Sequence, residues 1–217
     1  MKPVVDVFFS FRSPYSYLVT PELLALRKDF DVEVKLRAVL PIAIRTKGTL
    51  FTADNPNKVN YILLDAFRRA EYLAMPMVFP TPDPIVQDMT SFVVSEDQPY
   101  IYRLTALAIE AERRGKGIDF AHAVSRLIWG GSPNWDQGEK LSNAVASVGL
   151  NLDDMETAVA QYDYLAEIEN NQKMLDDAGH WGVPTMVFND EPFFGQDRVD
   201  TLRWRLDQHD LRRTNSA

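Results

Sequence analysis

The hydrophobic and polar positions at the start of the chain predict two strands with one helix between them. Residues 4–9 are apolar except for Asp6, a pattern typical of a central strand that is covered on both faces. In residues 32–38, apolar and charged positions alternate, as expected for a half-exposed edge strand. Residues 14–28 predict a helix that kinks or restarts at Pro21. This order predicts a βαβ unit with two parallel strands.

From about residue 41 to residue 178 the apolar positions recur with the period of a helix. One helix is predicted from about residue 162 to residue 178, and four more are predicted from apolar faces with residues three and four apart. The four faces are Val59, Ile62, Leu63, Ala66, Ala70 and Leu73; Ile101, Leu104, Ala108 and Ala111; Phe120, Val124, Leu127 and Ile128; and Leu141, Val145 and Val148. Residues 76–99 contain five prolines and are predicted to form an irregular connection.

Strand patterns return near the end of the chain. Residues 184–188 and 192–194 predict two strands, which a hairpin turn at residues 189–191 would join. A last helix is predicted from about residue 197, with one apolar face. That face consists of Val199, Leu202 and Leu206. The end of the chain therefore predicts a ββα unit.

The order of these elements predicts an α/β fold of the thioredoxin type. Residues 1–40 and 179–217 would supply the βαβ and ββα units of one thioredoxin-like domain. Residues 41–178 would be a large all-helical insertion that splits this domain in the middle.

Composition and charge limit the class of protein and its partners. With 217 residues, 46% of them hydrophobic and 25% charged, the chain has the composition of a globular protein. Its net charge of −8 argues against a nucleic-acid partner. No apolar run approaches the roughly 20 residues that span a bilayer, so no membrane partner is expected. The apolar start contains Asp6 and lacks a cleavage site, which favours a buried strand over a signal peptide and a cytoplasmic location.

The residue types available for chemistry exclude several kinds of site. The chain has no cysteine, which excludes disulfides, thiolate nucleophiles and cysteine-based metal sites. The three histidines, His122, His180 and His209, are far apart and lack the spacing of a metal-binding motif. No metal cofactor is therefore expected.

The tetrapeptide Ser13-Pro14-Tyr15-Ser16 stands between the first strand and the first helix, where Cys-Pro-x-Cys would mark a disulfide oxidoreductase. Proline is favoured at the first position of a helix, so one interpretation is that Ser13 caps the helix. The same position offers unpaired N–H groups and the positive end of the helix dipole, with which a hydroxyl can help to hold an anion. A thiolate is such an anion, and here it would have to arrive with a small molecule.

Two stretches near the end of the chain are candidates for the same site. Pro184 either begins its strand after an ordinary trans bond or follows Val183 through a cis peptide, which would turn the Val183 backbone outward. Gly195 predicts a turn. Asp197 then either caps the last helix or, together with Gln196, binds the charged end of a ligand.

Together these motifs resemble the family of kappa-class glutathione transferases and 2-hydroxychromene-2-carboxylate isomerases, within the DsbA-like thioredoxin superfamily. The resemblance covers nearly the whole chain. The specific matches are FFSFRSPYSYL at the start and GHWGVPTMVFNDEPFFGQDRVDTL at the end, with a looser match at NPNKVNYILLDAFRRAEYLAMPMVFP between them.

The resemblance implies a DsbA-like fold with glutathione as cofactor and Ser13 as the catalytic residue, which supports the glutathione thiolate. The backbone of Val183, before an expected cis Pro184, would pair with the cysteinyl unit, and Gln196 and Asp197 would hold the γ-glutamyl end. The family often has an asparagine in a loop of the insertion, which here corresponds to RTKGTLFTADNPNK. Its candidate contact residues are Lys47, Asn55 and Asn57.

The implied activity is an isomerase of the 2-hydroxychromene-2-carboxylate type in aromatic-compound degradation, with glutathione adding to the substrate so that its ring opens and a former double bond rotates. An aromatic carboxylate substrate would need a cation nearby, and a homodimer is expected. The cations available are Arg12, Arg45, Lys47 and Lys58. Trp181 is a candidate for a wall of the site or for a core or interface position. Two alternatives remain open: a kappa-class-like transferase or peroxidase, and a redox-inert DsbA-like binding module.

Overall fold

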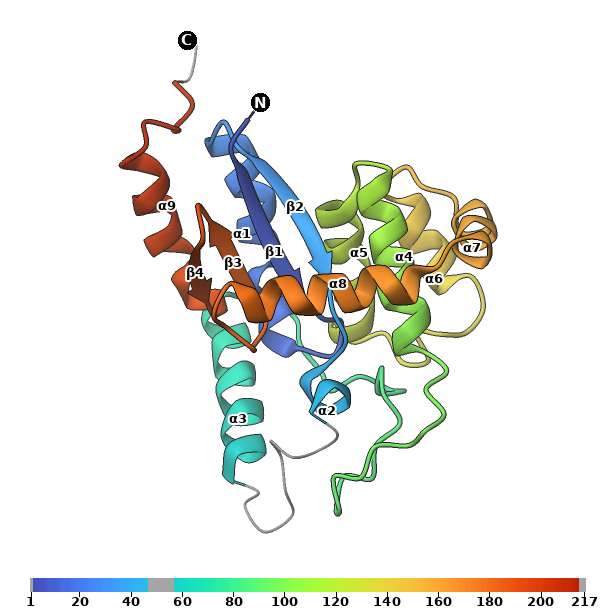
Figure 1. Ribbon diagram of the computed structural model, residues 1–217. Helices are drawn as coiled ribbons and strands as arrows, with labels where there is room; N and C mark the ends of the chain where they lie inside the picture. The colour runs from blue at the N-terminus through green and yellow to red at the C-terminus, as the bar shows by residue number, and fades with distance from the viewer. Residues whose placement is uncertain (1, 47–56, 215–217) are drawn as a thin grey trace.

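The computed structural model describes residues 2–46 and 57–214, which contain one four-stranded sheet (Figure 1). Its order is β2-β1-β3-β4. The strands are β1 (Val4–Phe9), β2 (Glu33–Ala38), β3 (Thr185–Phe188) and β4 (Glu191–Phe194). β1 pairs with β2 in parallel, whereas β3 is antiparallel to both β1 and β4. The predicted central strand, edge strand, parallel pair and hairpin are therefore confirmed.

The helices follow the predicted periodicity, with two additions. They are α1 (Pro14–Asp29), α2 (Ile42–Arg45), α3 (Asn57–Tyr72), α4 (Ile101–Arg113), α5 (Gly117–Trp129), α6 (Lys140–Ala146), α7 (Leu152–Gln161), α8 (Tyr164–Asp177), the 3₁₀ turn η1 (Gln196–Arg198) and α9 (Val199–Asp207). The sequence interpretation missed α2, which has four residues, and α7, in which Met155 alone is fully buried. Residues 76–99 form no helix or named strand, as predicted.

Helix α1 continues through Pro21 and does not restart there. A proline at this position cannot donate an N–H to the carbonyl of Tyr17, four residues earlier. The hydroxyl of Thr20 donates to that carbonyl instead, with Oγ1 and O 2.8 Å apart. The side chain of Thr20 thus supplies the hydrogen bond that the proline removes. Of the two predicted alternatives, the restart at Pro21 is wrong, and the kink stays a prediction.

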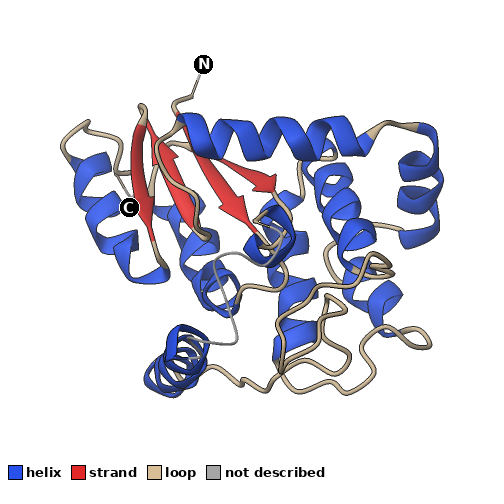
Figure 2. Ribbon diagram, turned by 60° about the horizontal axis from the view of Figure 1, so that its bottom comes forward, coloured by secondary structure: helices blue, strands red, loops and turns tan. Residues whose placement is uncertain are grey.

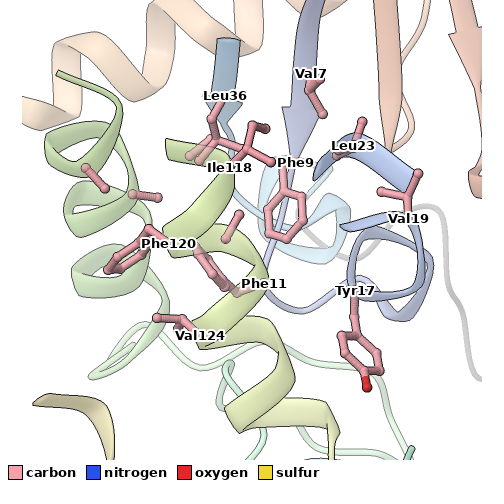
Figure 3. Close-up of a cluster of buried hydrophobic side chains, with 14 of the residues drawn as sticks. Val7, Phe9, Phe11, Tyr17, Val19, Leu23, Leu36, Ile118, Phe120 and Val124 are labelled. Atoms are coloured by element: carbon pink, nitrogen blue, oxygen red, sulfur yellow. The ribbon is translucent and has the colours of Figure 1, made fainter. Parts of the chain in front are cut away.

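Helices cover both faces of the sheet (Figure 2). On one face, side chains of β1 and β2 pack with α1 and α5 in the main core (Figure 3). On the other face, Phe8 packs against Leu175 of α8, which crosses the sheet (Figure 1). Asp6, the one polar residue of β1, forms an ion pair with Arg37 of β2 at 2.6 Å. Burial on two faces explains why β1 is almost continuously apolar.

One hydrophobic cluster joins the sheet to the helices of residues 41–178, since it includes Val7, Phe120, Leu141 and Leu202. The predicted thioredoxin-type arrangement, with a βαβ and a ββα unit around a helical insertion, is confirmed, while the domain boundaries after residues 40 and 178 stay a prediction. In the described part of the chain, no helix is long and apolar enough to cross a membrane.

Candidate active site

Ser13 occupies the N-cap of α1, after the short turn that follows β1. Its backbone is extended (φ −84°, ψ 117°), and its Oγ accepts a hydrogen bond from the Ser16 N–H at 3.2 Å. The Ser13 N–H donates to the carbonyl of Ser10 at 3.1 Å, which closes the turn between strand and helix. Pro14 follows as the first helical residue. The capping interpretation is confirmed, and the hydroxyl lies at the positive end of a 16-residue helix.

The turn before β3 brings Val183 against Ser13, across 170 positions of sequence. The peptide bond between Val183 and Pro184 is cis, as one of the two sequence interpretations held. The Ser13 hydroxyl donates to the Val183 carbonyl, with Oγ and O 3.2 Å apart. Among the described residues, none accepts a hydrogen bond from the Val183 N–H. This turn therefore offers a backbone donor beside the Ser13 hydroxyl.

A pocket of about 350 Å³ contains both residues. Its lining residues come from the segment after β1, from α1, α2 and α3, from the turn before β3 and from the end of β4. Its lining is largely apolar and aromatic, and consists of Ser10, Arg12, Ser13, Pro14, Tyr15, Pro41, Ile42, Ala43, Tyr61, Ile62, Trp181, Gly182, Val183 and Phe194. Trp181 is 52% exposed and lines the pocket, which supports its interpretation as a wall rather than a core residue.

Gln196 and Asp197 lie in η1, beside the pocket rather than in its lining. Gln196 is buried, and its Oε1 accepts a hydrogen bond from Nη2 of Arg69 in α3 at 3.0 Å. Asp197 is exposed and forms an ion pair with Arg198 at 3.3 Å. The suggestion that Asp197 caps the last helix is wrong, because Asp197 lies inside η1, whose N-cap is Gly195 (φ +108°), and the N-cap of α9 is Arg198. A glycine adopts this positive φ without strain.

Helix α3 adds polar groups that the sequence interpretation did not name. The hydroxyl of Tyr15 donates to Asp65 at 2.7 Å. Burial, followed by this hydrogen bond and the nearby charges of Asp65 and Asp197, raises the pKa of Tyr15, which therefore stays protonated. The Nε of Arg69 is buried and has no partner within the described residues. Asp65 and Arg69 are four apart on α3, a spacing that places both on one helix face.

The candidate cations differ in how their charge is balanced. Arg12 forms an ion pair with Asp83, with Nη2 and Oδ2 3.1 Å apart. Arg45 donates to two carbonyls, those of Leu40 at 2.8 Å and Trp181 at 2.7 Å, and burial lowers its pKa. Lys58 is exposed near the start of α3, as is Asn57. Lys47 and Asn55 lie outside the described residues.

Comparison with known proteins shows what the chain is similar to. A model of the DSBA-like thioredoxin domain matches residues 4–207. A curated 2-hydroxychromene-2-carboxylate isomerase of Sphingobium xenophagum is 26% identical over 206 residues, which cover 93% of this chain and 97% of the relative.

Solved structures share the fold. A 2-hydroxychromene-2-carboxylate isomerase has a TM-score of 0.72 at 20% identity, covering 95% of this chain and 96% of that one. A cytosolic disulfide reductase DsbM from Pseudomonas aeruginosa, solved with GSH, has a TM-score of 0.57 at 16% identity, covering 94% of this chain and 99% of that one.

Proposed function

Since the chain belongs to the family of DSBA-like thioredoxin domains, we propose that it is a glutathione-dependent isomerase of the 2-hydroxychromene-2-carboxylate type. The observation that carries this proposal is the Ser13 hydroxyl, which lies at the N-terminus of α1 and faces the cis-proline turn inside a pocket. The names of the curated relatives, which the chain matches over more than nine-tenths of its length, support the reaction class. Its place would be the cytoplasm, where thiols are kept reduced, and its role the degradation of aromatic compounds.

The described residues fit a bound glutathione. The unpartnered N–H and the carbonyl of Val183 suit the peptide of a cysteinyl unit, which offers one acceptor and one donor. The γ-glutamyl end carries an ammonium and a carboxylate, and the neighbourhood of η1 has both complementary charges. Asp197 supplies the negative charge, while Arg69, whose Nε is buried and unpartnered, supplies the positive one next to Gln196.

Ser13 would act by redirecting its one hydrogen-bond donor, the hydroxyl O–H. Its Oγ already accepts the Ser16 N–H, so its O–H is the only group that it can redirect. Turning this O–H from the Val183 carbonyl to the sulfur would stabilise the thiolate, and the N-terminus of α1 would add the favourable end of its dipole. Glutathione supplies a nucleophilic sulfur that adds reversibly to the substrate and is released unchanged after the bond rotates.

The pocket also suits the proposed substrate, an aromatic carboxylate. Tyr61, Trp181 and Phe194 form part of a largely apolar lining that can pack against a flat ring. Arg45 reaches the Trp181 carbonyl at the edge of this pocket, and its two hydrogen-bond partners among the described residues are neutral. Asp176 influences the charge of Arg45, but the described residues form no ion pair with Arg45. Arg45 is therefore better suited than Arg12, which already has Asp83, to balance the charge of the carboxylate.

Titration of glutathione into the purified protein, combined with two activity assays, tests this function. The expected result is one binding site per chain and isomerisation of 2-hydroxychromene-2-carboxylate, without conjugation of a generic aryl halide. Conjugation without isomerisation would support the transferase alternative. The absence of any binding heat would support the redox-inert binding module, and either result would overturn the proposed activity.

The proposed assembly is a homodimer, and an exposed surface of α3 supports it. This α3 surface surrounds a groove of about 530 Å³. Helix α3 itself lies at the edge of the molecule (Figure 1). It consists of Leu64, Phe67, Arg68, Glu71, Tyr72, Met75 and Met77. Arg68 lies 4.0 Å from Asp65, and Glu71 has no ion pair among the described residues. If two copies of α3 pack antiparallel about a two-fold axis, Arg68 faces Glu71 of the partner subunit, and the reverse contact repeats it.

Charge reversal tests this interface. Arg68→Glu and Glu71→Arg should each weaken dimerisation by about 10-fold, because each replaces two symmetric attractions with two repulsions. The double variant R68E/E71R should restore the affinity, since it only exchanges the two ends of each pair. Sedimentation equilibrium measures the dissociation constants of the wild type and of the three variants. A double variant that dimerises no better than the single variants would contradict the pairing.

A further inference from the structure

The turn from Trp181 to Pro184 is held by side chains from four separate positions. Three of these side chains donate to carbonyls of the turn: Arg45 to Trp181 at 2.7 Å, Thr185 to Gly182 at 2.7 Å, and Ser13 to Val183 at 3.2 Å. The fourth, His180, accepts the Gly182 N–H at its Nδ1, at 2.9 Å. Together these bonds fix the direction in which the free Val183 N–H points. His180 is the one side chain of the four that titrates near neutral pH.

Aromatic rings fix the orientation of His180. Its ring stacks on Phe194 with centroids 4.1 Å apart at 26°, and on Trp181 with centroids 5.3 Å apart at 18°. Gly182 makes this packing possible, because a Cβ at that position would lie 2.5 Å from Cε2 of Phe194. The imidazole therefore has little freedom to turn, and its Nδ1 stays directed at the Gly182 N–H.

We infer that His180 is a positioning residue: its neutral ring holds the turn that presents the Val183 N–H to the pocket, and its protonation releases that turn. An imidazole nitrogen accepts a hydrogen bond only through a free lone pair. A proton on Nδ1 would occupy that lone pair and oppose the Gly182 N–H. The ligand-binding consequence rests on the proposed function, since glutathione is the ligand that the Val183 N–H would meet.

The surroundings of the ring favour the neutral form. Burial lowers the pKa of His180 below its usual value of 6.5. Its ring contacts are Trp181 and Phe194, and no ionised side chain pairs with it among the described residues. Two charged groups are linked to the turn: Arg45 of α2 donates to the Trp181 carbonyl, and Asp176 of α8 interacts electrostatically with Arg45. The turn is therefore complete above pH 6.5 and is lost as the pH falls through the lowered pKa.

Two variants distinguish the role of the Nδ1 lone pair as an acceptor from the role of the ring in stacking. His180→Phe keeps an aromatic ring for stacking but lacks an acceptor. His180→Asn lacks the ring, but an asparagine carbonyl can accept the N–H two residues later, as in an Asx turn. Neither the phenylalanine nor the asparagine side chain titrates between about pH 5 and pH 8. His180→Phe should weaken glutathione binding roughly 5- to 10-fold at neutral pH, and His180→Asn should stay close to the wild type.

Calorimetric titration of glutathione from about pH 8 to pH 5 provides the readout. All three proteins should lose some affinity as the pH falls, because the thiol of bound glutathione is proposed to have a lowered pKa. The wild type should lose further affinity below pH 6.5, where His180 takes up a proton, and both variants should lack this additional loss. A His180→Phe variant with wild-type affinity, or a His180→Asn variant as weak as His180→Phe, would overturn the inference.

A measurement on the ligand-free protein separates this inference from the proposed function. The His180 ring nitrogens and the Gly182 amide, followed by NMR, should titrate together with a midpoint below pH 6.5. This result would support the positioning role even if glutathione failed to bind, in which case the proposed function alone would be wrong. A Gly182 amide that does not respond while the His180 ring titrates would overturn the inference whatever the ligand.

Discussion

Replacing Ser13 with alanine should lower kcat/KM for glutathione-dependent isomerisation by about 10- to 100-fold near neutral pH. A hydrogen bond to a charged group contributes about 1.5–3 kcal/mol, and each 1.36 kcal/mol corresponds to tenfold in rate. The Ser13 O–H is the pocket hydroxyl that lies beside the Val183 backbone and at the end of α1. Initial-rate kinetics against glutathione and substrate would measure the loss.

Asn151→Ala provides the matched control for this variant. Asn151 caps α7, as Ser13 caps α1, by accepting the N–H three residues later. Each substitution should lower the free energy of unfolding by about 1 kcal/mol, since each removes one cap. Only Ser13→Ala should change kcat/KM. Equal kinetic losses in the two variants would mean that Ser13 acts on stability alone.

Gly182→Ala should destabilise the protein by about 1–3 kcal/mol, through overpacking at the pocket wall, and should weaken glutathione binding. The added Cβ would lie 2.5 Å and 2.9 Å from two carbons of the Phe194 ring, and 3.2 Å from Cε1 of His180. Because Gly182 is buried and its neighbours are stacked, the rings can make room only by leaving their contacts. Urea unfolding and calorimetry would measure the two effects.

A double-mutant cycle with Phe194→Ala identifies the cause. Without the Phe194 ring, the new methyl group has space, so Gly182→Ala should cost at least about 0.5 kcal/mol less in that background. Purely additive free energies would show that the destabilisation comes from somewhere other than this contact.

Much of the fold could be predicted because buried positions recur along the sequence with the period of a strand or a helix. β1 is covered on both faces and β2 on one, and their sequences differ accordingly. The prediction failed where that signal is weak: α7 buries only Met155, although its capping residue Asn151 and the acidic residues after it mark a helix start. The predicted alternative of a helix restart at Pro21 was also wrong, because a hydroxyl one residue away replaces the missing hydrogen bond.

The candidate site was predictable where its residues lie within one local motif. Ser13, Val183 and Pro184 each have a distinctive neighbourhood in the sequence, and the fold brings them together. Contacts made by α3 could not be found in this way. The hydrogen bond between Arg69 and Gln196 depends on how α3 packs beside η1, and the periodicity of apolar residues does not predict such packing. The roles of Gln196 and Asp197 toward a ligand therefore stay a proposal.

The central claim is that a hydroxyl at the N-terminus of α1 stabilises the thiolate of bound glutathione. The ultraviolet absorbance of that thiolate, followed against pH in the wild type and in Ser13→Ala, tests it directly. The wild type should give a thiol pKa at least about one unit below the ordinary value near 8.5, and Ser13→Ala should return it toward that value. An ordinary pKa in the wild type, or the same lowered pKa in both proteins, would contradict the claim.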